Sequence, residues 1–420
     1  TTFHFAIESS MSAEQFDFPA AVRTDLPPPA SQWNGFPAFN FVGGHNAPES
    51  IPVDDLIAAA TAVLQREGAT LATYKLESGG LGYKPLRDFL VGKLKRHAGI
   101  ECSADEILLT SGSLQGMDLI NEVLLRPGDT IVIEEANYGG VLSRCRRLGV
   151  NMVGVPGDED GMDMDALERV LDELATAGTP PRYIYTIPTI QNPTATIMSL
   201  ERRQRMVALA KAHGVPIFED ECYSDLIWDG VRPPAVYAVD DSARTVFLGT
   251  FSKSIAPALR VGYVVAPANF LSQLCACKTD AGSGALEQMV LGEYCPQHFD
   301  DHVARLNGLL KEKCDVLMEA LAEHFGTAAE FNSPKGGIFL WVKFPQQVDT
   351  TRLVQVANAE SVAVNPGMEW SIEGSDAARA IRICYANPST DTLRRGVAQL
   401  AEICNREFGI PTHIANVDRS

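Results

Sequence analysis

The chain has 420 residues, of which 45% are hydrophobic and 21% are charged, and its formal net charge is −18 at pH 7. This composition is typical of a globular protein with one large domain or two domains. The negative charge and the lack of a basic run disfavour a nucleic-acid-binding surface, because phosphate backbones are bound by clustered Lys and Arg.

No apolar run is long enough to span a bilayer, and the first residues lack the pattern of a signal peptide. We therefore predict no membrane association and a cytoplasmic location. The nine cysteines do not form paired Cys-x-x-Cys motifs, so we interpret them as reduced thiols and assign no metal site.

Residues 1–50 contain several prolines and show neither a helical nor a strand period. We predict an irregular arm that lies across the rest of the protein or across a second subunit. A helix is predicted over residues 52–64, and the glycine-rich turn at 79–82 precedes a second helix that continues through Leu94.

Short apolar runs then alternate with helical patterns. The predicted strands are 107–110, 130–134, 150–155, 183–187, 216–220, 245–248 and 261–265, and the predicted helices include one that ends near 125 and others over 138–148, 165–175 and 201–212. This alternation predicts right-handed crossovers and an α/β fold with a mostly parallel sheet.

The pattern changes after about residue 300. We predict a helix over 303–325, a strand over 336–342, a helix over 351–357, strands over 362–364 and 380–384, and a last helix over 390–404. These elements indicate a smaller α+β domain. The predicted division is an N-terminal arm at 1–50, a large domain at 51–300 and a small C-terminal domain at 301–420.

Polar side chains follow the predicted strands. Asn192, Asp220 and Lys253 each stand just beyond a strand end, and the carboxyl ends of parallel strands meet at one edge of a sheet. Lys253 lies in a hydroxyl-rich loop upstream of Arg260, where desolvation and a cationic neighbour lower a lysine pKa and make the amine a nucleophile suited to a Schiff base. Taken alone, a Ser-Lys pair is more often a surface feature.

The segment 111–116, Ser-Gly-Ser-Leu-Gln-Gly, joins a predicted strand to a predicted helix. Free N–H groups and the positive end of the helix dipole make such a turn an anion cradle. An ordinary strand-to-helix connection is the alternative.

In this order, the hydroxyl-rich helix start, the Asn-Pro, the aspartate and the lysine resemble the fold type I pyridoxal-phosphate enzymes, specifically the class I and II aminotransferases. The resemblance runs from Gly43 to the last helix. It implies a three-layer fold, pyridoxal 5'-phosphate as the cofactor, and a homodimer with shared active sites.

The resemblance implies roles for the strand-end residues. Lys253 would hold the cofactor in a Schiff base and then move a proton between the substrate carbon and the cofactor carbon. Asp220 would pair with the pyridine nitrogen and keep it protonated. Tyr223 and Asn192 would hydrogen-bond the phenolic oxygen, and Tyr138 would stack on the ring, with core packing as its alternative role.

The resemblance also implies a phosphate site made of hydroxyl, amide and guanidinium groups. Its members would be Ser113, Leu114, Thr250, Ser252, Arg260 and Tyr74, the last from the second subunit. Leu114 stands where many relatives have a polar residue, so we expect its backbone to make the contact. Core packing is the alternative for Tyr74.

Arg382 lies on a predicted strand between apolar neighbours, and a buried arginine is costly unless it is paired. It matches the family position that binds the substrate carboxylate, although a structural salt bridge is the alternative. Asn192 and Gly44 would also contact the substrate. The turn 43–46 and the loop 365–370 differ from the commoner apolar versions in the family, and both would line the substrate side-chain pocket. In them, His45, Asn46 and Glu369 point to a polar or amine-bearing substrate side chain, or else cap loops.

The implied activity is ping-pong transfer of an amino group from an amino acid to the cofactor and then to a 2-oxo acid such as 2-oxoglutarate or pyruvate. The alternative enzymes are a β-elimination lyase, a decarboxylase or a racemase acting on an α-amino acid. A cofactor-binding domain of a transcriptional regulator is a further alternative. The negative charge and the lack of a helix-turn-helix pattern ahead of the fold disfavour it.

Overall fold

The computed structural model describes residues 18–24, 26, 29, 35–75, 78–372 and 376–412. Residues 1–17 of the predicted arm and 413–420 of the predicted small domain lie outside the described residues. The chain divides into two compact units, 1–36 and 37–420. The helix α1 (Phe18–Ala21) belongs to the first unit, and the elements described below belong to the second.

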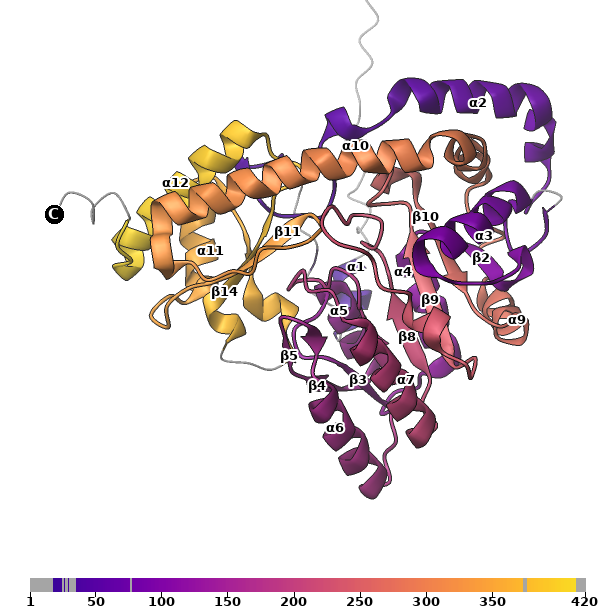
Figure 1. The fold of residues 1–420 in the computed structure, drawn as a ribbon, viewed down its shortest axis with the longest axis horizontal. Helices are drawn as coiled ribbons and strands as arrows, with labels where there is room; N and C mark the ends of the chain where they lie inside the picture. The colour runs from indigo at the N-terminus through magenta and orange to yellow at the C-terminus, as the bar shows by residue number, and fades with distance from the viewer. Residues whose placement is uncertain are drawn as a thin grey trace, which may run out of the picture. The chain divides into compact units, whose positions relative to one another are not determined.

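A seven-stranded sheet forms the larger part of the second unit (Figure 1). Its strands, in spatial order, are β2 (Ile107–Ser111), β10 (Val261–Val265), β9 (Thr245–Thr250), β8 (Ile217–Asp220), β7 (Ile184–Thr186), β3 (Thr130–Glu134) and β4 (Asn151–Val155). Neighbouring strands are parallel except that β10 runs antiparallel to both β2 and β9. The predicted α/β fold with a mostly parallel sheet is confirmed.

Helices cover both faces of this sheet. The helices of this region are α2 (Val53–Glu67), which packs against α10, and α3 (Lys84–Ala98), α4 (Ser113–Leu124), α5 (Gly139–Leu148), α6 (Met164–Thr176), α7 (Leu200–His213), α8 (Val236–Val239), α9 (Ala268–Cys277) and α10 (Ala285–Phe325). Successive residues of β9 point to opposite faces, so Phe247 packs in the cluster that contains Leu90 of α3, whereas Leu248 packs in the cluster that contains Ile120 of α4. A strand buried on both faces reads as a continuous apolar run, which is why these strands could be predicted.

Helix α10 is 41 residues long and packs against α2 and α3 at one end and against α12 (Thr390–Phe408) at the other (Figure 1). The predicted start of this helix at 303 was wrong, because Pro296 lies inside the helix rather than ahead of it. The predicted domain boundary at residue 300 falls within α10. The division into large and small domains stays a prediction.

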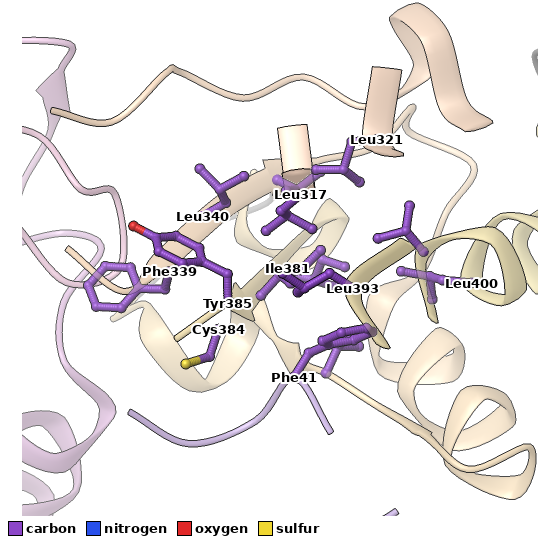
Figure 2. Close-up of a cluster of buried hydrophobic side chains, with 14 of the residues drawn as sticks. Phe41, Leu317, Leu321, Phe339, Leu340, Ile381, Cys384, Tyr385, Leu393 and Leu400 are labelled. Carbon is purple, nitrogen blue, oxygen red and sulfur yellow. The ribbon is translucent and has the colours of Figure 1, made fainter. Parts of the chain in front are cut away.

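The C-terminal region contains a three-stranded antiparallel sheet, β11-β14-β13. Its elements are β11 (Phe339–Lys343), α11 (Thr350–Ala359), β12 (Val362–Ala363), β13 (Asn365–Pro366), β14 (Ala380–Cys384) and α12. Figure 2 shows the core beneath this sheet, where Leu317 and Leu321 of α10 meet Ile381 of β14 and Leu393 of α12.

Part of the predicted arm belongs to the same core. Phe41 is fully buried in it, and β1 (Phe39–Asn40) pairs in parallel with β12 (Figure 2). A small hairpin, β5 (Gly157–Asp158) and β6 (Gly161–Met162), completes the described strands. Of the helices that the structure describes, none is both long and apolar enough to cross a bilayer.

Candidate active site

The carboxyl ends of β2, β9, β8, β7 and β3 lie at one edge of the main sheet, because these strands share one direction. The predicted site residues at or shortly beyond these strand ends are, in the same order, Ser113, Lys253, Asp220, Asn192 and Tyr138. The sheet therefore gathers residues that are far apart in sequence along a single edge.

Lys253 lies three residues beyond β9, and its Nζ donates a hydrogen bond of 2.5 Å to the carbonyl oxygen of Gly44. Burial lowers the pKa of this amine below its ordinary value, and the charges of Arg382 and Arg260 act in the same direction. A lowered pKa enlarges the neutral fraction of the amine at neutral pH, and the neutral amine is the nucleophilic form.

Asp220, the last residue of β8, is buried. Its Oδ2 accepts a hydrogen bond of 2.7 Å from the hydroxyl of Tyr185, and its Oδ1 accepts one of 3.2 Å from the backbone N–H of Cys222. Burial raises the pKa of Asp220, and in the described part of the chain no cationic side chain pairs with it. A buried carboxylate without a cation is suited to bind one.

Asn192 connects the main sheet to the C-terminal sheet. Its Nδ2 donates to the hydroxyl of Tyr223 at 3.2 Å, and its Oδ1 accepts from Nη1 of Arg382 at 3.3 Å. Burial raises the pKa of Tyr223 well above its ordinary value, so the hydroxyl stays protonated and can donate a hydrogen bond of its own.

Arg382, in the middle of β14, is only 4% exposed. Its Nη2 donates to Oδ1 of Asn365 at 3.0 Å and to the carbonyl oxygen of Gly43, and its guanidinium lies 3.9 Å from the ring centre of Trp370. Among the described residues its Nε has no hydrogen-bond partner and no carboxylate forms a salt bridge with it. A buried arginine with neutral partners only is suited to bind an anion.

The start of α4 lacks a side-chain cap. Its N-cap residue is Gly112, with φ of 76°, whereas α6, α7, α11 and α12 each have an Asp or Ser side chain in that role. The backbone N–H groups of Ser113 and Leu114, in the first turn, have no acceptor within the helix. These N–H groups and the helix dipole favour an anion at this point.

The guanidinium of Arg260 lies beside this helix start. A Cβ added to Gly112 would overlap the guanidinium of Arg260, so the absence of a side chain at Gly112 leaves room for the arginine. The loop that leads to it contains Thr250 and Ser252, and the backbone N–H of Ser252 donates to Oγ1 of Thr250 at 3.1 Å. A helix start, hydroxyls and a guanidinium fork together match the oxygens of a phosphate group.

Tyr138 caps the start of α5. Its ring lies over Gly140 and 5.9 Å from the ring of Trp370. Tyr74, in contrast, is 83% exposed on a turn after α2, and the described contacts join it to none of the other predicted site residues. Within one chain the structure therefore brings Tyr138 into the cluster but not Tyr74.

The predicted substrate-pocket residues differ in their surroundings. A Cβ added to Gly44 would lie within contact distance of both Nζ of Lys253 and the hydroxyl of Tyr223. Nδ2 of Asn46 donates to the backbone oxygen of Lys253 at 2.7 Å, so Asn46 supports the lysine loop. Burial lowers the pKa of His45, and the charge of Lys253 acts in the same direction. Glu369 is exposed at the surface.

Three residues of this region were not selected from the sequence: Glu134, Asn137 and Tyr185. Glu134 and Asn137 lie at and just beyond the end of β3, so the strand-end rule could have selected them. Tyr185 lies inside β7, so no local sequence signal marked it. Asn365 and Trp370 belong to the loop 365–370 that was expected to line the substrate pocket, but their contacts with Arg382 follow only from the tertiary fold.

Known proteins share this arrangement of elements. The model of a family described as aminotransferase class I and II matches residues 51–400. Aromatic-amino-acid aminotransferase 1 of Thermococcus litoralis is 32% identical over 372 residues, which cover 88% of each chain. An uncharacterized HTH-type transcriptional regulator of Bacillus subtilis is 32% identical over 322 residues, which cover 76% of this chain and 65% of the regulator.

One solved structure contains a cofactor derivative. It is LysN, an alpha-aminoadipate aminotransferase from Thermus thermophilus complexed with N-(5'-phosphopyridoxyl)-L-leucine. Its TM-score is 0.80 at 30% identity, and the match covers 88% of this chain and 92% of that chain.

Proposed function

Because this chain belongs to the aminotransferase class I and II family and is a pyridoxal-phosphate-dependent transaminase, we propose that the strand-end cluster is its active site. One observation carries the proposal. Lys253, Asp220 and Arg382 are ionisable groups inside the protein that, among the described residues, have no opposite charge paired with them. Each has the chemistry to bind one part of the cofactor or of the substrate.

The described residues fit pyridoxal phosphate. Lys253 would bind its aldehyde carbon, Asp220 its pyridine nitrogen, and the start of α4 with Arg260 its phosphate. Tyr223 and Asn192 would hydrogen-bond its phenolic oxygen, and Tyr138 would cover one face of its ring. When bound, the cofactor supplies an electron sink for the electron pair that the substrate α-carbon retains when it loses its proton.

The amine of Lys253 moves the proton in this scheme. Because burial lowers its pKa, Nζ is available as a neutral base that can take the proton from the substrate α-carbon. Asp220 would supply a negative charge to the ring nitrogen, and its hydrogen bonds to Tyr185 and Cys222 fix the carboxylate in place.

Arg382 would bind the carboxylate that both substrates carry next to the reacting carbon. Its unpartnered Nε and its neutral surroundings leave the guanidinium free to pair with an anion. An amino acid and a 2-oxo acid place this carboxylate alike, so one site serves both half-reactions. We infer 2-oxoglutarate or pyruvate as the acceptor, and the amino donor follows from the test below.

We also infer a homodimer. The stripe of Val53, Ile57, Leu64 and Leu71 along α2 and the turn after it is exposed, as is Tyr74. A contiguous exposed apolar stripe favours a protein interface. A second copy on this stripe would cover the apolar side chains and allow Tyr74 to reach the partner's phosphate site.

The test is an absorbance titration of the holoenzyme with a panel of amino acids, followed by 2-oxoglutarate or pyruvate. We expect a visible band that one donor class bleaches and that the 2-oxo acid restores. A band that bleaches without return, while ammonia or carbon dioxide appears, would instead identify an elimination or a decarboxylation on the same site. A band that no amino acid changes would contradict the proposed site.

A further inference from the structure

The segment that contains Trp370 is hydrogen-bonded to the backbone just beyond strand β3. The backbone N–H of Asn137 donates to the carbonyl oxygen of Trp370 at 2.8 Å, and the N–H of Ile372 donates to the carbonyl oxygen of Glu135 at 3.1 Å. Between them, Ala136 and Ser371 form an antiparallel bridge. The backbone after the short helix η7 (Gly367–Trp370) is therefore fixed to the main sheet.

Asn137 is fully buried at the centre of this joint. Its Nδ2 donates to Oε2 of Glu134 at 2.6 Å, and its Oδ1 accepts from the N–H of Tyr138 at 2.7 Å. The other carboxylate oxygen of Glu134 accepts from Oγ1 of Thr186 at 2.6 Å and from the N–H of Ile187 at 3.1 Å. Glu134 thus fixes the Asn137 amide to β7, and Asn137 holds the backbones of Tyr138 and Trp370.

Trp370 in turn lies against the guanidinium of Arg382. The ring centre is 3.9 Å from Cζ, while the hydrogen bonds from Nη1 to Asn192 and from Nη2 to Asn365 act at the edges of the guanidinium. A ring stacked on an arginine fixes the tilt of the guanidinium plane, which edge-on hydrogen bonds define less well. Bidentate binding of a carboxylate depends on this tilt.

Packing alone does not explain a tryptophan here. The indole Nε1 is buried, and among the described residues it has no hydrogen-bond partner. A buried N–H without a partner lowers the free energy of unfolding, and a smaller apolar residue such as phenylalanine or leucine would not have that cost. The larger ring face toward Arg382 is the property that tryptophan adds, because Trp is the strongest cation–π partner.

We propose that Trp370 is a positioning residue of the carboxylate site, held by the Glu134–Asn137 pair so that its ring sets the plane of Arg382 for both substrates. This inference rests on the proposed function, because it requires that Arg382 binds the substrate carboxylate. It adds a role for three residues that do not themselves contact the reacting atoms.

The experiment compares Trp370→Leu, Trp370→Phe and Asn137→Ala with the wild type as holoenzymes. Steady-state kinetics use L-glutamate with pyruvate and L-alanine with 2-oxoglutarate as probes, because a donor paired with its own 2-oxo acid gives no net reaction. A second readout is the rate at which hydroxylamine, which has no carboxylate, reacts with the bound cofactor. Asn151→Ala, at an exposed position at the start of β4, is the matched control for Asn137→Ala.

We expect Trp370→Leu to raise the KM of both the amino acid and the 2-oxo acid by about three- to thirtyfold, the range of a desolvated cation–π contact. The hydroxylamine rate should stay that of the wild type, because it does not use Arg382. Trp370→Phe should recover most of the KM loss. Asn137→Ala keeps the backbone N–H that binds Trp370 and removes the side-chain hydrogen bonds to Glu134 and Tyr138, so it should raise both KM values by a smaller factor. A purely structural role would instead lower the active fraction and leave both KM values unchanged.

Unchanged KM values for both substrates in folded Trp370→Leu would overturn the inference. If that variant does not fold, Asn137→Ala decides by the same criterion. The variant Arg382→Lys distinguishes failure of the Trp370 inference from failure of the proposed carboxylate site. If it raises both KM values while the Trp370 and Asn137 variants do not, only this inference fails. If Arg382→Lys leaves both unchanged, the proposed carboxylate site fails and the inference fails with it.

Discussion

The amine of Lys253 is largely buried, and its Nζ donates a hydrogen bond to the carbonyl oxygen of Gly44. The buried Arg382 and the exposed Arg260 both act to lower its pKa. Removal of the amine takes away both the cofactor anchor and the proposed base. We expect Lys253→Ala to lose at least about 10²- to 10⁴-fold in turnover, the usual contribution of a positioned base, and to release the cofactor on dialysis. Activity and absorbance after dialysis measure both effects.

Lys84→Ala is the control for this experiment, since Lys84 is an exposed lysine at the start of α3. Wild-type turnover in Lys253→Ala would remove this residue from the active site.

A substitution at Asp220 tests the role of its negative charge. The substitution Asp220→Asn would keep the size of the side chain but remove the negative charge that stabilises a protonated ring nitrogen. We expect a fall in turnover with a smaller change in the free energy of unfolding. Asp241→Asn, at an exposed ion pair with Lys211, is the control, and full activity in Asp220→Asn would refute the electron-sink role.

Glu134 makes stability depend on pH. Burial raises the pKa of this carboxyl from its usual 4.5 to about 7. Between these values the folded protein keeps a proton that the unfolded chain has lost. The contribution of Glu134 to the free energy of unfolding is therefore fully present below about pH 4.5 and is lost as the pH rises to about 7.

The shift in the pKa of Glu134 from 4.5 to about 7 corresponds to about 3 kcal/mol in the free energy of unfolding. We expect the wild type to lose about this much stability relative to Glu134→Gln between about pH 5 and 8, because glutamine does not titrate. Denaturant unfolding of both holoenzymes at several pH values measures the difference. Parallel stability curves would show that Glu134 does not titrate in this range.

At the scale of elements, the start of α4 combines an open helix end with a glycine that leaves room for Arg260. In Gly112→Ala the added Cβ would displace the guanidinium, and the positive φ would be strained. Gly128→Ala also has a positive φ but no atom within 4 Å of the added Cβ. We expect both variants to lose stability and only Gly112→Ala to bind pyridoxal phosphate more weakly.

Fluorescence titration of the cofactor-free proteins with pyridoxal phosphate measures this affinity. Equal affinities of the two variants would mean that the α4 start does not bind the phosphate.

The elements that could be predicted are those whose sequence pattern is local. Strand β3 is buried on both faces and reads as the continuous apolar run Ile131-Val132-Ile133, so its place was evident. The first half of α10 was missed because Gly292 and Pro296 resemble helix breaks. Gly292 is required by the ring of Tyr83, which occupies the space of a Cβ, and that neighbour is known only from the fold.

The candidate site divides in the same way. The strand-end rule selected Asn192, Asp220 and Lys253 because the direction of a parallel sheet follows from the order of its elements. The loop 365–370 was expected at the substrate pocket, but the contacts of Trp370 and Asn365 with Arg382 depend on tertiary packing and could not be predicted. The roles of the selected residues stay predictions until the variants above are measured.

At the scale of the whole molecule, the proposed dimer can be tested by complementation. A Lys253→Ala subunit keeps Tyr74, and a Tyr74→Ala subunit keeps Lys253. If Tyr74 completes the partner's site, random mixing of the two inactive or weakened chains should restore about a quarter of the wild-type sites, because about half of the dimers are mixed and each has one complete site.

Activity after co-expression, together with sedimentation of the mixture, measures this recovery. A dimer that forms without any recovery would place Tyr74 outside the partner's site.

Strand β10 runs antiparallel to both of its neighbours in the main sheet. Because β10 runs back along β9, Lys253 and Arg260 both lie on the one connection between these paired strands. The spacing between the proposed covalent and ionic anchors of the cofactor is therefore set by a few consecutive residues. Arg382 and Trp370 come from the C-terminal region, so substitutions there can alter how tightly the substrate carboxylate is bound while the cofactor keeps its place.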